Sequence, residues 1–149
     1  MFKGSYQHSI DDKGRLSLPA RFREQIIERS KGREEITLTS VMDCIEVYPL
    51  LEWERIEEKL LNAPTMDKDI QVFKRIFFSR AHDCSLDKQG RILLPAGMRE
   101  KCNIVNKQVL IVGVMNKIEI WALDKWKEIE EGLGSKFDEI RDKLVSFGI

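Results

Sequence analysis

The stretch Asp11–Glu24, DDKGRLSLPARFRE, returns 76 residues later as Asp87–Glu100, DKQGRILLPAGMRE. The two stretches share eight of their fourteen residues, namely Asp, Gly, Arg, Leu, Pro, Ala, Arg and Glu. Chance does not give a match of this length, so the chain is a tandem duplication. Two copies are too few for a solenoid, and we expect a pseudo-twofold pair that buries one shared core.

The similarity continues beyond the repeated stretch, at an offset of 73 residues. Nine residues of the first copy recur in the second at this offset. They are Val41, Met42, Ile45, Glu46, Trp53, Ile56, Glu57, Glu58 and Leu60, which return as Val114, Met115, Ile118, Glu119, Trp126, Ile129, Glu130, Glu131 and Leu133. We interpret the change of offset as a loop three residues longer in the first copy, around 30–34. The chain then divides into a first module at 5–52, a helical linker at 53–80, a second module at 81–124 and a C-terminal helix at 125–149.

Alternating apolar residues and turn residues predict that each module is mainly strand. Each copy is expected to open as a β-hairpin, because Gly14 and Gly90 allow the positive φ of a tight turn between two strand-like runs. Pro19 and Pro95 fit the first turn of a short helix. The expected elements are strands at 6–10, 15–18, 84–86 and 91–94, helices at 20–27 and 96–102, and paired strands at 36–39 with 45–48 and at 109–114 with 118–121.

Three further segments have the apolar spacing of amphipathic helices. They are 50–61, 67–78 and the region from 125 onward, which we expect either to extend through Gly132 and Gly134 or to break there, and then to run on. Their apolar side chains are expected to serve the core or contacts between subunits, with Trp53, Phe73, Phe77 and Trp126 as candidates for the subunit surface. The predicted class is mainly β with α, an α+β fold.

Composition excludes several classes of protein. The chain has 149 residues, of which 42% are hydrophobic and 34% charged, so it suits one compact domain or two very small ones and not a large enzyme, a fibre or a low-complexity segment. Neither a membrane span nor a signal peptide is expected, because apolar runs are short and Gln7, His8 and Ser9 lie where a signal peptide would need an apolar stretch. Cys44, Cys84 and Cys102 are few and far apart, which favours reduced thiols in the cytoplasm.

The net charge is zero, but its distribution is uneven. Residues 1–33 carry +4, 34–71 carry −7, 72–101 carry +4 and 102–149 carry −1. The two basic blocks hold the repeated stretches. Such blocks are often only solvated surface, so the pattern alone does not assign a nucleic-acid partner.

Chemistry typical of an enzyme is missing from the sequence. We find no nucleophile–base pair, phosphate-binding glycine loop or spacing of metal ligands, so we expect neither catalysis nor a cofactor. A hydrolase that used Asp11 or Asp87 as a base is a distant third interpretation, because an arginine partner would lower the carboxyl pKa.

Both copies keep a polar tip, DDKGR at 11–15 and DKQGR at 87–91. A good turn accounts for the Asp and Gly but not for the Arg. Asp11 and Asp87 can each hold the guanidinium four residues later, Arg15 or Arg91, by a charge-assisted hydrogen bond, so that the long side chain is oriented before binding.

An oriented guanidinium suits guanine in a major groove that is wide enough for a two-stranded ribbon. The residues predicted to contact DNA with Arg15 and Arg91 are Lys13, Lys88, Gly14 and Gly90. Further candidates for phosphate contacts are Lys3, Arg21, Arg23, Arg80 and Arg99. The competing interpretation is a purely structural Asp–Arg pair.

The paired Asp-x-x-x-Arg tips, followed by LSLPA at 16–20 and ILLPA at 92–96 on a chain that opens Met-Phe-x-Gly, resemble the MraZ family of bacterial regulators, which have two SpoVT-AbrB modules. The resemblance covers the whole chain. It implies a swapped-hairpin β-barrel formed within one chain, assembly into a ring, and location with the nucleoid. It also implies repression of the division and cell-wall gene cluster, the protein's own promoter included, through G-rich direct repeats in double-stranded DNA.

Within the matching motif, Asp11, Arg15, Asp87 and Arg91 agree fully, whereas the charged positions between them differ. The two modules therefore need not contact DNA equally. The alternative function is a protein-interaction module such as an antitoxin, because AbrB-like folds also occur there. A second complete module in place of a disordered tail disfavours that alternative.

Overall fold

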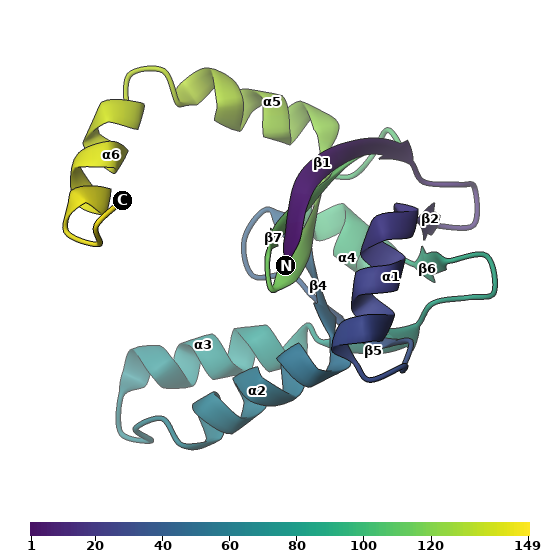
Figure 1. Cartoon of the computed structure of the whole chain (residues 1–149), viewed down its shortest axis with the longest axis horizontal. Coiled ribbons are helices and arrows are strands. Elements are labelled where there is room, and N and C mark those ends of the chain that lie inside the picture. Colours follow the sequence, from purple (N-terminus) through teal and green to yellow (C-terminus); the bar gives the residue numbers. More distant parts are fainter.

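A computed structural model describes all 149 residues and gives an α+β fold, as the sequence predicts (Figure 1). The elements in chain order are β1 (Phe2–Ser9), β2 (Arg15–Ser17), α1 (Ala20–Arg29), β3 (Glu35–Thr39), β4 (Cys44–Pro49), α2 (Leu50–Leu61), α3 (Lys68–Ser79), β5 (His82–Ser85), β6 (Arg91–Leu93), α4 (Ala96–Lys101), β7 (Gln108–Met115), β8 (Lys117–Ala122), α5 (Leu123–Gly132) and α6 (Phe137–Val145).

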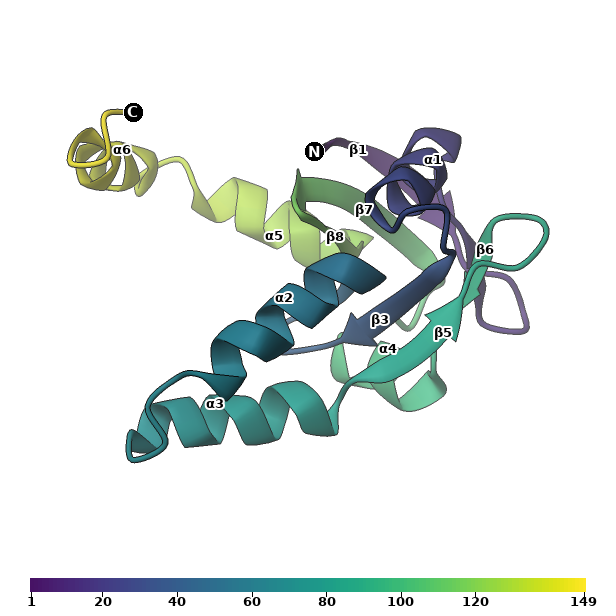
Figure 2. The same cartoon turned by 60° about the horizontal axis from the view of Figure 1, so that its bottom comes forward.

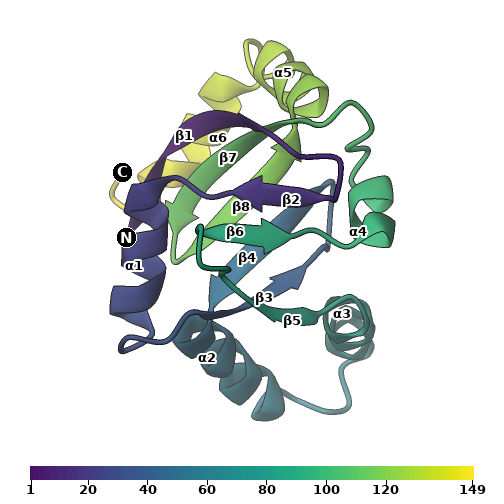
Figure 3. The same cartoon turned by 90° about the vertical axis from the view of Figure 1, so that its right-hand side faces the viewer.

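The strands pair in two sheets, one of six strands in the order β1-β7-β8-β4-β3-β5 and one of two strands, β2 and β6. Figure 3 shows the β2–β6 ribbon in front of the larger sheet. The expected pairs β3–β4 and β7–β8 are present and antiparallel. The boundaries of the four predicted chain segments remain a prediction, and strand pairing crosses between the two copies.

The prediction of an opening β-hairpin in each copy is wrong in one respect. The first two strands of a copy, β1 and β2 or β5 and β6, do not pair with each other. β1 pairs with β7, β5 pairs with β3, and β2 pairs with β6. Each opening strand therefore bonds to the other copy. The reason is that alternation and a tight turn define two strands but do not specify the partner of either one.

The pairing registers establish the pseudo-twofold relation. Leu16 is opposite Ile92, its equivalent at the offset of 76. Glu46 is likewise opposite Glu119, its equivalent at the offset of 73. When equivalent residues of antiparallel strands face each other, a local twofold axis passes between them. The axis therefore runs through the β2–β6 ribbon and through the β4–β8 pair.

One shared core lies between the two sheets and helices, as the duplication predicts. Its 21 buried residues come from both copies. Leu16 and Ile92 on the ribbon are fully buried, and so are Ile45 and Ile118 on the larger sheet. Phe22 of α1 fills the space beside β1, where its ring meets Phe2 edge to face at a centroid distance of 5.6 Å.

The extra three residues of the first copy lie in a helix and not in the longer loop that the sequence suggested. Helix α1 has 10 residues and α4 has 6. The segments that follow them, 30–34 and 102–107, are of similar length. The added length continues the apolar face of α1, because it contains Ile26, which is fully buried.

Helices α2 and α3 form a hairpin with a small core of their own. Trp53 and Phe77 are buried there with Tyr48, and the Trp53 and Phe77 rings stack at 5.0 Å. The helix predicted at 50–61 is confirmed, and α3 begins one residue later than predicted because Asp67 caps it and accepts hydrogen bonds from the N–H groups of Asp69 and Ile70. Burial rules out Trp53 and Phe77 as a free subunit surface.

The C-terminal helices extend away from the shared core. Of the two outcomes that the sequence leaves open near Gly132 and Gly134, the structure has the break, which separates α5 from α6. Neither helix contains a buried residue. Trp126 of α5 is half-buried and its ring contacts that of Trp121. Figures 1 and 2 show α6 at the end of an arm, on the side opposite the β1–β2 and β5–β6 loops. No helix combines the length and the apolar character needed to cross a membrane.

Candidate nucleic-acid interface

The first tip, residues 11–15, is organised by the carboxylate of Asp11. Its Oδ1 accepts the backbone N–H groups of Lys13, at 2.9 Å, and Arg15, at 2.8 Å. Its Oδ2 accepts the Nε–H of Arg15 at 2.6 Å. Gly14 has a φ of +82°, and its N–H donates to the Asp11 carbonyl. The Asp–Arg contact expected from the sequence is thus present, on a turn that glycine makes favourable.

The second tip, residues 87–91, repeats this geometry. Asp87 Oδ1 accepts the N–H groups of Gln89 and Arg91, each at 2.9 Å, and Oδ2 accepts Nε–H of Arg91 at 2.8 Å. Gly90 has a φ of +72°. The same hydrogen bonds therefore form with different residues at the second and third tip positions, because the bonds there use backbone N–H groups.

These contacts stabilise the ionised carboxylates. The hydrogen bond from the backbone N–H of Arg15 is the main cause that lowers the pKa of Asp11. Desolvation opposes it, and the hydrogen bonds from the Arg15 side chain and the Lys13 N–H lower the pKa further. Arg91 lowers the pKa of Asp87 in the same order of causes. A carboxylate of lowered pKa is a poor general base, which argues against a hydrolase centred on either tip.

The ribbon between the tips presents both arginines on one face. Successive residues of a strand point to opposite sides, and Leu16 and Ile92 point into the core. Arg15 and Arg91 therefore point outward, where their side chains are 32% and 25% exposed. In Figures 1 and 2 the two loops that carry the tips project from the same side of the molecule.

The other predicted DNA contacts lie at varied distances from this face. Lys13 and Lys88 are exposed on the tips, and Arg21 is exposed on α1. Lys3 is exposed near the start of β1, at the strand end remote from the first tip. Arg80 follows α3, and its Nη1 donates to the Ser40 carbonyl at 2.8 Å. Arg80 therefore braces the turn between β3 and β4.

Arg23 and Arg99 are half-buried against the tips, a contact that sequence reasoning missed. Arg23 lies beside Gly90 of the second tip, and Arg99 lies beside Gly14 of the first. The only sequence signal was the repeated Arg itself, at equivalent positions of both copies. Spacing along the chain could not show that each Arg approaches the tip of the other copy.

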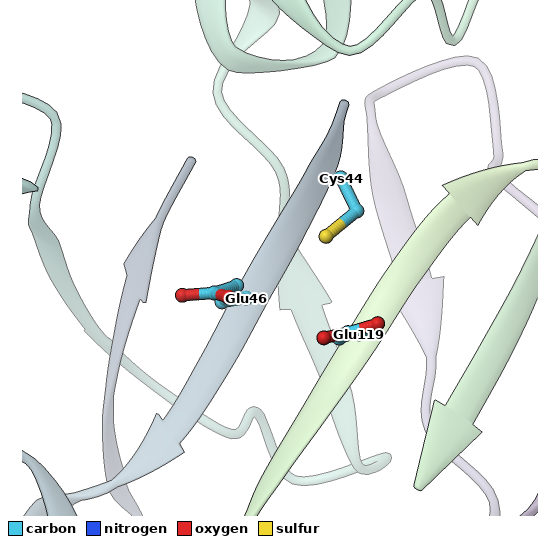
Figure 4. A group of neighbouring side chains, drawn as sticks. All are labelled: Cys44, Glu46 and Glu119. Carbon is cyan, nitrogen blue, oxygen red and sulfur yellow. The ribbon is translucent and has the colours of Figure 1, made fainter. Parts of the chain in front are cut away.

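A separate cluster on the β4–β8 pair has the residue types of a metal site. Figure 4 shows Cys44 and Glu46 on one strand and Glu119 on the next, and their ligand-type atoms lie within 4.8 Å of one another. Lys117 is already bonded there, with a hydrogen bond from Nζ to Glu46 and a distance of 3.0 Å to a Glu119 oxygen. The ammonium thus supplies the positive charge between the carboxylates, and the cluster does not fit a metal.

The three cysteines are free thiols. Burial raises the pKa of Cys44 and also raises the pKa of Cys84 and of Cys102, each to about 11. Such thiols remain protonated at neutral pH and are weak nucleophiles and metal ligands. They act as small apolar side chains, as the sequence suggested.

A duplicated α+β core that presents two Asp-held arginines on one ribbon defines a two-module protein whose halves share a single core. A model of the family described as "MraZ protein, putative antitoxin-like" matches residues 1–76 and 77–147. The chain therefore belongs to the MraZ family.

Curated relatives match the chain over its full length. The protein named "Transcriptional regulator MraZ" of Syntrophomonas wolfei is 42% identical over all of both chains. A protein of the same name from Pelotomaculum thermopropionicum is 44% identical over all of this chain and 99% of its own, and one from Heliobacterium modesticaldum is 42% identical over all of both.

Proposed function

We propose that this protein is a sequence-specific DNA-binding transcriptional regulator without catalytic activity. The observation that carries the proposal is the pair of Asp-held arginines, Arg15 and Arg91, on the outer face of one ribbon. Relatives that match the full length and are named transcriptional regulators support it.

The proposed mechanism follows from the geometry of the tips. The Nε–H of each arginine bonds to its aspartate, which leaves the terminal guanidinium nitrogens available for guanine O6 and N7. Because each side chain is held before binding, less conformational entropy is lost when the contact forms. Lys13 and Lys88 supply positive charge next to phosphate and add affinity that does not depend on sequence.

The family resemblance extends the proposal to a biological role. The protein represses the division and cell-wall gene cluster, including its own promoter, by binding short G-rich direct repeats in the cytoplasm, on the nucleoid. Subunits assemble into a homo-oligomer, in the form of a ring. Exposed apolar side chains on the helices support this assembly, and they are Val72, Phe73, Ile76, Phe78, Phe137, Ile140 and Val145.

The test measures binding to duplex DNA with G-rich direct repeats and to a scrambled duplex of equal composition, over a range of salt concentrations. Replacement of both tip arginines, Arg15→Ala with Arg91→Ala, should weaken specific binding by about 1–3 kcal/mol for each lost base contact and leave circular dichroism unchanged. Lys13→Ala should weaken binding to both duplexes and lower the salt slope by about one.

The matched control removes two positive charges from exposed positions on the helices, Lys59→Ala with Arg75→Ala, and should leave the preference for the repeats intact. Unchanged affinity for the repeats in the folded double-arginine variant would refute the proposal.

The second candidate is an antitoxin-like protein-interaction module, which is favoured by the description of the family as antitoxin-like. Under that alternative, the tips are structural turns and the exposed apolar helices bind a partner protein. The DNA titration separates the two, since an interaction module should show no preference for the repeats and no dependence on Arg15 or Arg91.

A further inference from the structure

Each tip glycine contacts an arginine from the other copy. A Cβ placed on Gly90 would lie 2.1 Å from Nη1 and 2.2 Å from Cδ of Arg23. A Cβ placed on Gly14 would lie 3.0 Å from Nη2 and 3.3 Å from Cζ of Arg99. Arg23 and Arg99 are equivalent residues at the offset of 76, so the duplication repeats the contact at both tips.

Hydrogen bonds link the same segments. Nη1 of Arg23 donates to the Gln89 carbonyl of the second tip at 3.3 Å. The carbonyl of Gly90 accepts the N–H of Leu18, which belongs to the first copy, at 3.1 Å. At the other tip, the Gly14 carbonyl accepts the N–H of Leu94 at 2.9 Å. Arg99 Nε donates to the carbonyl of Leu94 in its own copy, so Arg99 contacts the first tip by packing against Gly14.

We propose that Arg23 and Arg99 are positioning residues that hold the tip of the opposite module, so that Arg23 sets the orientation of Arg91 and Arg99 sets that of Arg15. The inference rests on the proposed function and changes the role of two residues that the sequence presented as candidate phosphate contacts. Each glycine is needed for its positive φ, and Gly90 is needed also because a side chain there would displace the Arg23 guanidinium.

The shape of the contact argues for arginine in particular. A planar guanidinium can lie flat against a glycine backbone and still donate in its own plane, whereas a lysine ammonium is a compact charge that cannot do both. The Arg23 Nε is buried without a hydrogen-bond partner, so packing is a large part of what holds this side chain. Arg23→Lys therefore keeps the charge but removes the brace.

The first experiment needs no DNA. Relaxation of backbone amides and of the arginine Nε–H groups is measured by NMR in the full chain. Arg23→Lys should increase the mobility of 87–91, including the Nε–H of Arg91, and leave 11–15 unchanged. Arg99→Lys should do the reverse. Arg21→Lys, an exposed residue of the same helix as Arg23, is the matched control and should affect neither tip.

The second experiment uses double-mutant cycles for binding to the G-rich repeat duplex. Arg23→Lys should lower affinity about tenfold, part of the loss expected for the arginine it positions, and Arg75→Lys, at an exposed position of α3 outside the proposed interface, less than about twofold. Its effect should largely vanish in the Arg91→Ala background and persist in the Arg15→Ala background. Arg99→Lys should show the opposite dependence.

The inference is overturned if the effect of Arg23→Lys on binding depends on neither Arg15 nor Arg91 and if the relaxation data show an unchanged second tip. Arg23 is then only a candidate phosphate contact. Should Arg23→Lys lower the thermal midpoint sharply, Arg23→Gln is measured in the same way. If Arg15→Ala with Arg91→Ala leaves DNA binding unchanged, the proposed function fails, and the relaxation experiment still decides whether the brace exists.

Discussion

At the scale of single residues, Asp11 does more than hold an arginine. Its Oδ1 accepts two backbone N–H groups and its Oδ2 accepts the Arg15 side chain, so one carboxylate both shapes the turn and orients the guanidinium. Asp87 has the same pair of roles. Because Oδ1 shapes the turn and Oδ2 orients the guanidinium, a mutation that changes only one oxygen can separate the two roles.

Asp11→Asn should weaken DNA binding without a large loss of stability. The amide oxygen can keep both backbone bonds at Oδ1, but the amide nitrogen then faces the Nε–H of Arg15, donor against donor. We expect a thermal midpoint close to that of the parent and an affinity reduced by up to about the 1–3 kcal/mol of one base contact. A large drop in stability with affinity per folded molecule unchanged would mean that the aspartate is structural only.

The same contacts predict a pH dependence of tip order. The pKa of Asp11 is lowered from its ordinary value of 3.8, so its stabilising contribution is present above 3.8 and is lost as the pH falls further, through the folded value. The Nε–H signal of Arg15 should stay protected at pH 5 and lose protection below pH 3.8. In Asp11→Asn the Nε–H signal of Arg15 should no longer change between pH 5 and pH 3.8 or below, whereas the Nε–H signal of Arg91 should still lose protection.

At the scale of elements, the β4–β8 pair sets two like charges opposite each other on the pseudo-twofold axis. Glu46 and Glu119 face across the ladder, and Lys117 bonds to both. Tyr48 and Trp121 donate one further hydrogen bond to each carboxylate. The lysine has no symmetric counterpart, since its equivalent position holds Cys44. One copy thus supplies the charge that both need.

Lys117→Met should lower the free energy of unfolding by about 1–3 kcal/mol at pH 7, because two half-buried carboxylates then face each other without a cation. Burial lowers the pKa of Lys117, but its bonds to Glu46 and Glu119 outweigh this and raise it above its ordinary value of 10.5. The contribution is therefore present below 10.5 and lost as the pH rises further.

Urea unfolding of the parent and Lys117→Met should give curves that converge above that pH. Lys125→Met, which replaces another partly exposed lysine of the second copy, is the control and should change stability by less than about 0.5 kcal/mol. Equal stability of parent and Lys117→Met at pH 7 would contradict the role of the lysine.

At the scale of the whole molecule, the two tips proposed to contact DNA and the exposed apolar residues of α3 and α6 lie on opposite sides. The tips project from one side, and α6 lies at the end of the arm on the other (Figure 2). Phe137, Ile140 and Val145 of α6 are exposed, as are Val72 and Phe73 of α3. Contacts between subunits through these helices would leave both tips of each subunit free for DNA.

Assembly should therefore control affinity. A chain that ends at residue 134 lacks α6, none of whose residues is buried, so it should fold with an unchanged thermal midpoint but form smaller assemblies by light scattering. The parent should bind duplexes with one, two, three or four repeats with an affinity that rises with each added repeat. The truncated chain should bind the longer duplexes about 10² to 10⁴ times more weakly than the parent does. A parent monomer that binds one repeat as tightly as four would refute multivalent binding.

The duplication, the two tips and most helices could be predicted from the sequence because they depend on local rules. Gly14 and Gly90 at the turns, Pro19 and Pro95 before short helices, and periodic apolar residues in 50–61 each act within a few residues of the chain. The Asp–Arg contacts follow for the same reason, since a tight turn brings residues four apart together.

Only the tertiary structure decided what pairs with what. Strand β1 bonds to β7 instead of β2, and Arg23 reaches Gly90 across 67 positions of the chain, because a duplicated sequence offers two equivalent partners for every segment. The local sequence pattern is the same whether a strand pairs within its own copy or with the other copy. The choice is made by packing, since pairing β2 with β6 buries Leu16 against its equivalent Ile92 and closes one core, where two separate hairpins would leave two halves exposed.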